Sequence, residues 1–458
     1  MHIPNRDELT KILDTPIFRK ISETADELGL ECYVVGGYVR DSLMGVESKD
    51  IDMEVHGVSP DMLMEILSRF GEVISMGASF GIYNIKGYSL DIAMPRKETA
   101  RGVGHRDFDV FVDPFIGTEK AAERRDFTIN ALMQNVLTGE IIDHFGGKGD
   151  IEKGIIRHVN DSSFAEDPLR VLRAAQFAAR FDFAVAEETV TLCSKMDLTT
   201  LSKERIETEL EKALLKADKP SVFFENLRKM NQLDYWFKEL KDIIGVQQNP
   251  QFHAEGDVWT HTMMVLDEAA KYRDKAENPK GFMLAALCHD YGKAICTEVV
   301  DGRIRSIGHE TKGLPLVETF LNRITSEIKL INYVLNLCAL HMKPNALAGM
   351  NAGVKSTNKM FDQAQDQTAL VYMAMADNYG RIMANGITPH EDFLFERLEI
   401  FNDIMTKPYV QGRDLIEAGV EPSEKFSDYL DYAHKLRLAG VDKNAALKQT
   451  LAYIRKRK

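Results

Sequence analysis

The hydrophobic pattern of the chain changes once, near residue 160, and this change limits the possible folds more than any other feature. Before it, short β-prone runs such as Cys32–Val35 and Ile51–Val55 alternate with helical segments such as residues 61–70. After Phe164, helical periodicity dominates and strand patterns nearly vanish. We therefore expect an α+β multidomain protein, in which an α/β head precedes all-α domains.

The length of 458 residues exceeds what one hydrophobic core organises, so several domains are expected. We predict a head at 1–160, a helical neck at 161–245, a second helical domain at 246–400 and a helical tail at 401–458. The segment 245–256, which contains Asn249 and Pro250, is the best candidate for a linker. Helices are predicted at 167–181, 203–216, 221–239, 257–271, 281–290, 314–337, 367–379 and 391–405, and residues 1–30 also have helical spacing.

The charge and cysteine content restrict the class of protein only weakly. The net charge of −13 argues against nucleic acid as a partner, but phosphate contacts need only a local basic groove. The stretch 442–458 carries six basic residues and one acidic residue, which fits either such a groove or a solvated helical tail. Five scattered cysteines without a CxxC pair, and no run of ~20 apolar residues, indicate a cytoplasmic protein that does not span a membrane.

The head contains a pattern suited to phosphate chemistry. Gly36 and Gly37 end a predicted strand and open a helix, so the backbone can approach a phosphate at a helix N-terminus, and Arg40 can fork onto a phosphate oxygen. Asp50 and Asp52 leave the same face of the next strand, where two carboxylates can bind Mg²⁺. Each feature has a structural alternative when it is considered alone. The glycine turn can be an ordinary tight turn with a surface ion pair between Arg40 and Asp41, and the two aspartates can lie on a solvated strand face.

Three motifs in order carry a family resemblance. They are GGYVRDSLMGVESKDIDMEV at 36–55, RRDFTINA at 124–131 and EDPLRVLR at 166–173. Together they resemble class II tRNA nucleotidyltransferases and bacterial poly(A) polymerases, within the polymerase-β-like superfamily. The resemblance implies that Asp50 and Asp52 are catalytic metal ligands and that Asp167 and Arg170 read the incoming base. The other residues that it places around the nucleotide are Gly36, Gly37, Arg40, Arg125, Asp126, Asn130 and Arg173.

Several of these positions have a second interpretation. Asp167 before Pro168 is also a helix N-cap, so it can serve the helix, the base or both. Asp91 is either a third carboxylate of the head or a strand-edge residue that faces water. Gln176 stands where close relatives are expected to have an arginine. The loop after residue 94, with Arg101, His105 and Arg106, is either the family's nucleotide-switching loop or a surface loop.

The second helical domain contains a histidine–aspartate set. His261, the pair His289–Asp290 and Asp377 occur in the order of the HD superfamily of phosphohydrolases, which this region resembles. The resemblance makes these four the ligands of a divalent ion, which is Mg²⁺, Mn²⁺ or a transition metal. His309 and His341 match the extra ligands of a larger site for one or two metals. His253 is either an outer residue of the site or a neighbour of the helix N-cap.

The combined pattern predicts a CTP/ATP:tRNA nucleotidyltransferase that adds CCA to tRNA 3′ ends by two-metal transfer, with Mg²⁺ in the head. The predicted partners are the tRNA 3′ end, CTP and ATP. Phosphatase or 2′,3′-cyclic phosphodiesterase activity is expected of the second domain by the same resemblance. The alternatives are a poly(A) polymerase, an enzyme that adds only CC or only A, an HD phosphohydrolase with a nucleotide-sensing head, and a tRNA-binding scaffold.

Overall fold

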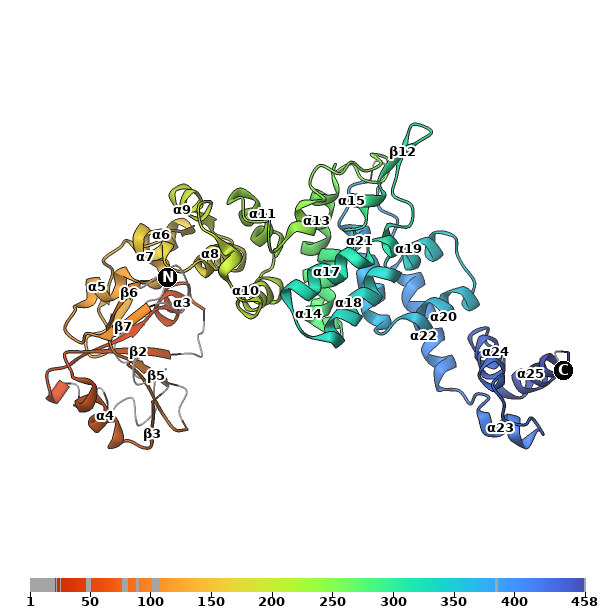
Figure 1. Cartoon of the computed structure of the whole chain (residues 1–458), viewed down its shortest axis with the longest axis horizontal. Coiled ribbons are helices and arrows are strands. Elements are labelled where there is room, and N and C mark those ends of the chain that lie inside the picture. The colour runs from red at the N-terminus through yellow and green to blue at the C-terminus, as the bar shows by residue number, and fades with distance from the viewer. Residues whose placement is uncertain are drawn as a thin grey trace. The chain divides into compact units, whose positions relative to one another are not determined.

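The computed structural model describes residues 21, 23, 24, 26–46, 51–75, 81–87, 90–100, 108–383 and 386–456. Most of the predicted helix at 1–30, Asp50 and the loop residues 101–107 lie outside the described residues. The chain packs as two compact units: 1–213 with 222–235, and 214–221 with 236–458 (Figure 1). No helix of the described residues is long and apolar enough to cross a membrane.

The head is built on a seven-stranded mixed sheet with the order β3-β4-β5-β2-β1-β8-β9. The strands are β1 (Glu31–Val35), β2 (Ile51–His56), β3 (Val73–Ser75), β4 (Ile82–Ile85), β5 (Leu90–Ala93), β8 (Met133–Asn135) and β9 (Ile141–Ile142). Only β2 and β5 pair in parallel, whereas all the other neighbours are antiparallel. Tyr33, Val35 and Met133 of the central strands pack into one buried cluster with Ala122 and Ala131.

The first-unit helices follow the hydrophobic periodicity except at 221–239, where α11 ends at Lys229 and residues 230–237 form no α-helix. Helix α4 begins after Ser59, whose side chain accepts a hydrogen bond from the Met62 backbone, with Pro60 at the first helical position. Strands β6 (Arg96–Ala100) and β7 (Phe108–Val112) form a separate antiparallel pair. The helices of the head and neck are α3 (Gly37–Leu43), α4 (Pro60–Ser68), α5 (Thr118–Glu123), α6 (Gly147–Lys153), α7 (Asp161–Ala165), α8 (Leu169–Phe181), α9 (Glu187–Cys193), α10 (Lys203–Lys216) and α11 (Ser221–Lys229).

The second unit is a helical bundle around α14 (Pro279–Cys288), which is buried from Gly281 to Cys288 and is therefore apolar on every side. The predicted helix at 314–337 is two helices, because Thr325 is extended and separates α17 from α18. The other helices are α12 (Lys238–Lys241), α13 (Val258–Ala270), α15 (Lys293–Cys296), α16 (His309–Lys312), α17 (Leu314–Ile324), α18 (Ile328–Leu340), α19 (Met342–Gly349), α20 (Val354–Gln363), α21 (Gln367–Tyr379) and α22 (Glu391–Thr406).

Two parts of this unit differ from the sequence expectation. A β-hairpin, β12 (Glu298–Val300) and β13 (Arg303–Arg305), interrupts the helices, and it projects from the bundle in Figure 1. Its turn is Asp301–Gly302, and both residues have positive φ, as a two-residue hairpin turn requires. The segment 245–256 is not a loose linker. The Gly245 backbone donates to Asp257 Oδ2, and the Ala254 backbone donates to the Ile382 carbonyl.

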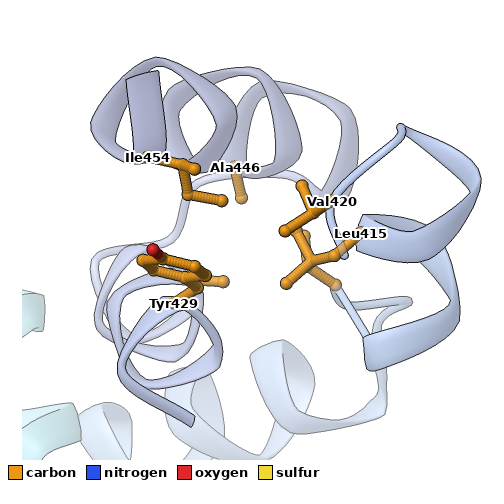
Figure 2. Close-up of a cluster of buried hydrophobic side chains, with 7 residues drawn as sticks. Leu415, Val420, Tyr429, Ala446 and Ile454 are labelled. Atoms are coloured by element: carbon orange, nitrogen blue, oxygen red, sulfur yellow. The ribbon is translucent and has the colours of Figure 1, made fainter. Parts of the chain in front are cut away.

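The tail has a hydrophobic core of its own. Leu415 from α23 (Gly412–Glu417), Tyr429 from α24 (Phe426–Leu438) and Ile454 from α25 (Lys443–Arg455) point toward one another in Figure 2. Asp442 caps α25, and its carboxylate accepts hydrogen bonds from two backbone N–H groups of the first turn.

Candidate active sites

The turn between β1 and α3 strongly favours glycine at its first position. Gly36 has φ of +68°, and a Cβ there would lie 3.0 Å from Arg125 Nη1. Its backbone N–H donates to the Leu132 carbonyl at 3.2 Å, which ties the turn to the segment before β8. The motif arginine Arg125 therefore lies directly against the glycine turn, as a shared nucleotide site requires.

Strand β2 brings the carboxylates of the head to one face of the sheet. Asp52 is exposed, and in the parallel register of β2 and β5 its Cα pairs with that of Asp91. Asp91 is also exposed, and its Oδ1 accepts a hydrogen bond from Asn84 at 3.0 Å. Because paired residues of adjacent strands share a face, Asp52 and Asp91 form a carboxylate pair at the sheet surface. Asp50 lies outside the described residues.

Glu54, which the sequence analysis did not single out, fixes Arg125 of this site through buried contacts. It is two residues after Asp52 on the same strand, but its side chain is buried, 2.9 Å from His56 Nε2 and 3.4 Å from Arg125 Nη2. Burial alone would raise the pKa of Glu54, but the hydrogen bond with His56 and the charge of Arg125 lower the pKa to about 2. The ionised carboxylate thus holds Arg125 in place.

Arg40 lies in a buried network, and neither interpretation from the sequence describes it. Its Nε and Nη2 donate to Asp41 Oδ1 at 2.8 and 2.6 Å, and its Nη1 donates to Asn130 Oδ1. The guanidinium also lies over the rings of Phe177 and Phe181. Only 4% of Arg40 is exposed, so it is neither a surface ion pair nor an open phosphate fork. In this structure it joins α3 to the RRDFTINA motif and to α8.

Asp126 joins the same motif to the neck. Its Oδ1 accepts from Asn130 Nδ2 at 3.0 Å, and its Oδ2 accepts from Arg173 Nε at 2.7 Å. Burial would raise the pKa of Asp126, but the charge of Arg173 and the hydrogen bond from Asn130 lower it. Asp126, Asn130 and Arg173, which were predicted to lie around one nucleotide, are thus in direct contact.

The expected base-reading pair is held by protein partners. Asp167 Oδ1 accepts from the Leu169 backbone at 3.1 Å, which fits a capping role, although Pro168 is the residue directly before α8. The carboxylate of Asp167 also accepts from Arg205 Nη2 at 2.9 Å. Arg170 does not pair with Asp167, and donates instead to the carbonyls of Ser163 and Arg124. Arg205, 38 residues later on α10, was missed because nothing in the local sequence distinguishes it.

The second unit brings its predicted ligands into one buried cluster. His261 from α13 has Nε2 3.1 Å from Asp377 Oδ1 and 3.6 Å from Asp290 Oδ2. His289, at the end of α14, has Nε2 3.2 Å from Asp290 Oδ2. All four of these residues are buried. Three helices of the bundle, α13, α14 and α21, therefore bring these four side chains together.

His309 and His341 complete this cluster on the other side of Asp290. Their Nε2 atoms lie 3.1 and 3.9 Å from Asp290 Oδ1, and 3.4 Å from each other. Asp290 thus has one carboxylate oxygen toward His289 and the other toward His309 and His341. Two of the groups within metal-ligand reach are His261, His289 and Asp290 on one side, and Asp290, His309 and His341 on the other.

The backbone fixes which ring nitrogen faces the cluster. The Nδ1 atoms of His289, His309 and His341 donate to the carbonyls of Ala286, Ser306 and Cys338, each three residues earlier. When Nδ1 carries the proton, a neutral ring presents a lone pair on Nε2. Three such lone pairs face Asp290. The buried His289 Nε2 and Asp290 Oδ1 have no hydrogen-bond partner within the described part of the chain, while Asp290 Oδ2 contacts Lys293. This donor set fits a divalent metal.

The electrostatics of Asp290 and His341 agree with ligation, whereas burial would lower the pKa values of His261 and His309 but contacts with Asp377 and Asp290 raise them. Burial alone would raise the pKa of Asp290, but the charges of His289 and Lys293 hold it well below its usual range. Burial and the neighbouring His289 lower the pKa of His341 to about 3, which keeps that ring neutral. Ionised carboxylate and neutral imidazole are the forms that bind metal.

Glu255 is an outer partner that the sequence analysis missed. Its Oε1 lies 3.1 Å from His261 Nδ1 and 2.8 Å from His253 Nδ1, while its Oε2 accepts from the Ile382 backbone. It thus orients the ring of His261 so that Nε2 faces the cluster. His253 lies behind Glu255, as the outer-residue interpretation predicted.

A cavity of about 390 Å³ leads to this cluster. Asp290, His309, His341 and Asp377 line it, together with residues 303–307 that include β13. Lys293, also in the lining, has Nζ 2.6 Å from Asp290 Oδ2 and donates to Gln248 Oε1. The buried donors are therefore reachable by a substrate.

Two family models match the chain. The poly A polymerase head domain matches residues 32–157, and the probable RNA and SrmB-binding site of polymerase A matches residues 182–244. The multifunctional CCA protein of Acinetobacter baylyi is 31% identical over 424 residues, covering 88% of this chain and 99% of that protein. The multifunctional CCA protein of Mannheimia succiniciproducens is 32% identical over 415 residues, covering 86% and 93%. This chain belongs to the multifunctional CCA protein family.

Solved structures of CCA-adding enzymes have the same fold. The Thermotoga maritima CCA-adding enzyme, complexed with tRNA, has a TM-score of 0.65 at 21% identity and covers 99% of this chain and 100% of its own. The Bacillus stearothermophilus CCA-adding enzyme, in complex with CTP, has a TM-score of 0.63 at 21% identity and covers 97% and 99%. The chain thus shares its mixed-sheet head and following helical domains with these CCA-adding enzymes.

Proposed function

We propose that this chain completes the 3′ end of tRNA by adding CMP, CMP and AMP from CTP and ATP. The observation that carries the proposal is the exposed pair Asp52 and Asp91, in register on β2 and β5, on the sheet whose β1–α3 turn abuts Arg125. Carboxylate oxygens suit Mg²⁺, so Asp52 and Asp91, with Asp50 before them, are the groups that would hold it. Bound Mg²⁺ would lower the pKa of the attacking hydroxyl and neutralise the charge of the leaving pyrophosphate.

The reaction transfers a nucleotidyl group in one displacement. The terminal ribose hydroxyl of tRNA forms a bond to the α-phosphorus, the bond from that phosphorus to the pyrophosphate oxygen breaks, and the hydroxyl proton leaves to water. Gly36 and Gly37 allow the triphosphate to approach the backbone, and Arg125, held by Glu54, faces the same turn. The protein thus contributes mainly position and charge.

We assign base selection to Asp167 and Arg170. Each carboxylate oxygen has two acceptor sites, so the contacts with Leu169 and Arg205 leave acceptor capacity at Asp167. An acceptor and a set of N–H donors suffice to read the edges of C and A.

Extension of defined tRNAs tests this function. Starting from tRNA that lacks its last three nucleotides, CTP alone should add two residues, CTP with ATP should add three, and addition should then stop. A long tail from ATP alone would instead identify a poly(A) polymerase. Arrest after two residues with both nucleotides present would identify a CC-adding enzyme, and the absence of any addition would contradict the proposal.

We infer a second function, hydrolysis of phosphoesters at the His–Asp cluster. The observation that favours it is the set of three Nε2 lone pairs directed at Asp290 in a buried but accessible cavity. His261, His289, Asp290 and Asp377 would hold one divalent ion, and Asp290 with His309 and His341 a second one. Mg²⁺, Mn²⁺ or a transition metal bound there would generate a hydroxide-like nucleophile from water.

A 2′,3′-cyclic phosphate is the substrate we propose for this site. Water oxygen forms a bond to phosphorus, one of the two ring P–O bonds breaks, and the released ribose oxygen takes up the proton. Lys293, beside Asp290, adds positive charge where the phosphate would lie. Removing metal with EDTA should abolish hydrolysis, and re-adding a divalent ion should restore it. Hydrolysis that persists unchanged in EDTA would contradict the metal assignment.

We keep the four-part division into a head at 1–160, a neck at 161–245, a second domain at 246–400 and a tail at 401–458 as a proposal. The separate tail core, which begins at Val410, supports a distinct tail, but α22 (Glu391–Thr406) runs across the proposed boundary at residue 401.

A further inference from the structure

The β12–β13 hairpin brings positive charge to the cavity of the His–Asp cluster. Arg303 and Arg305 of β13 line the cavity together with Asp290 and His309. They are two residues apart on a strand, so both leave the same face, roughly 7 Å apart. Both are exposed, and neither has an ion-pair partner within the described ranges. These two guanidinium groups are therefore available to a ligand.

An aromatic side chain lies in the same lining. Phe252 is 44% exposed and belongs to the 245–256 segment. That segment is fixed to the bundle, since the Ala254 backbone donates to the Ile382 carbonyl and Glu255 contacts His261. Ile307, which follows the hairpin and also lines the cavity, is 62% exposed. The cavity thus combines metal-binding groups, two open arginines and an exposed ring on a fixed support.

These features match the chemistry of a nucleic acid strand end. Arginines on one strand face can bind successive backbone phosphates, and an exposed ring can stack on a base without regard to its identity. A strand end of several nucleotides offers both phosphates and bases to these groups, whereas a small phosphoester offers a single phosphate. The chain as a whole has a net charge of −13, so the positive charge at this cavity differs in sign from the charge of the whole protein.

We propose that β13 and Phe252 bind the last nucleotides of an RNA strand, and that the hydrolase site therefore acts on phosphates at RNA ends in preference to small free phosphoesters. This inference rests on the proposed hydrolase function. Arg303 and Arg305 contact the phosphates that precede the terminal nucleotide, and Phe252 stacks on the terminal base. The terminal phosphate then lies at Asp290.

The test compares two substrates: a five-nucleotide RNA that ends in a 2′,3′-cyclic phosphate, and bis(p-nitrophenyl) phosphate. In the double variant Arg303→Ala/Arg305→Ala, the ratio of kcat/KM for the RNA to kcat/KM for the small ester should fall at least about tenfold. The salt dependence of kcat/KM for the RNA should weaken by roughly 1.4 units of log–log slope, because about two phosphate contacts are lost at ~0.7 each. The hairpin is exposed, so the variant should keep its fold.

A matched control removes two positive charges elsewhere in the second unit. Lys355 and Lys359 are exposed on α20 and do not line this cavity. Lys355→Ala/Lys359→Ala should leave both rates unchanged. An unchanged ratio in the hairpin variant, or an equal fall in the control, would overturn the inference while the hydrolase function stands. If the metal-loaded wild type hydrolyses neither substrate, the hydrolase function fails, and the inference fails with it.

Phe252 gives a second, independent readout. Phe252→Leu should raise KM for the RNA by about tenfold with little change in kcat, because it removes the aromatic face. Phe252→Tyr keeps an aromatic face and should have the KM of the wild type. Equal KM values for Phe252→Leu and the wild type would contradict stacking.

Discussion

At the scale of single residues, the buried carboxylate of Asp126 connects the nucleotide motif to the neck. It accepts hydrogen bonds from Asn130 and Arg173, and these partners lower its pKa although burial acts in the opposite direction. A carboxylate with a lowered folded-state pKa stabilises the fold above its unfolded pKa of about 3.9, and this stability is lost as the pH falls below that value.

We therefore predict that acid weakens the first unit through Asp126. Asp126→Asn should lower the free energy of unfolding at pH 7 by roughly 3 kcal/mol, because Arg173 loses its partner, and should flatten the fall in stability below pH 4. Both tryptophans, Trp236 and Trp259, belong to the second unit. Circular dichroism should thus register the change while the tryptophan fluorescence transition stays in place. If the free energy of unfolding of the variant falls as steeply below pH 4 as that of the wild type, Asp126 is not the group responsible.

Asp167 allows selection and capping to be separated by two substitutions. Asp167→Ala should relax the choice of nucleotide, since an unpaired donor or acceptor penalises the wrong base by about 1–3 kcal/mol, and should also cost about 1 kcal/mol of stability. Asp167→Asn keeps a capping oxygen and should lose selectivity with almost unchanged melting. Incorporation of CTP, ATP, GTP and UTP beside a melting curve measures both effects. Wild-type selectivity in both variants would assign Asp167 to capping alone.

The sequence identified the residues that belong to motifs but not the partners that hold them. Asp126 and His289 were predicted because their neighbours in the chain repeat known patterns. Glu54, Arg205 and Glu255 were missed, because each acts through a contact that only the folded chain creates. Arg40 was predicted to be open to a phosphate, yet it is buried under Phe177 and Phe181.

At the scale of elements, the β1–α3 turn depends on Gly36 more than on Gly37. Gly36→Ala should destabilise the head by about 1–2 kcal/mol and displace Arg125, because φ is positive and the new Cβ would lie 3.0 Å from Nη1. Gly37→Ala is the control, since its Cβ would meet only Arg40 Nη2 at 3.5 Å. Nucleotide addition and melting should both suffer more in the first variant. Equal effects would contradict this account of the turn.

Helices were predictable from the sequence where one apolar stripe runs without interruption, as in α10, α21 and α22. The prediction was wrong where a local conformation overrides periodicity: Thr325 is extended and splits the predicted helix at 314–337. The β12–β13 hairpin was missed although Asp301–Gly302 is a favourable hairpin turn, because its strands are short and lie among helices. Segment 245–256 resembled a linker in composition but carries Glu255 and Phe252.

At the scale of the whole molecule, each candidate site lies within its own unit. The head site uses residues between Gly36 and Arg173 of the first unit, and the His–Asp cluster uses residues between His253 and Asp377 of the second. The two sites also differ in chemistry, with carboxylates on a sheet in one and imidazoles on helices in the other. Their catalytic activities should therefore be separable by substitution.

Reciprocal inactivation tests this central claim most directly, with both reactions measured on each variant. Asp52→Ala should lower CMP and AMP addition to tRNA by at least about 1,000-fold and spare hydrolysis of a 2′,3′-cyclic phosphate. His289→Ala should lower that hydrolysis by at least about 100-fold and spare nucleotide addition, with circular dichroism as the check on folding. If either substitution abolishes both reactions in a folded protein, or neither reaction responds to its own substitution, the account of two independent sites is wrong.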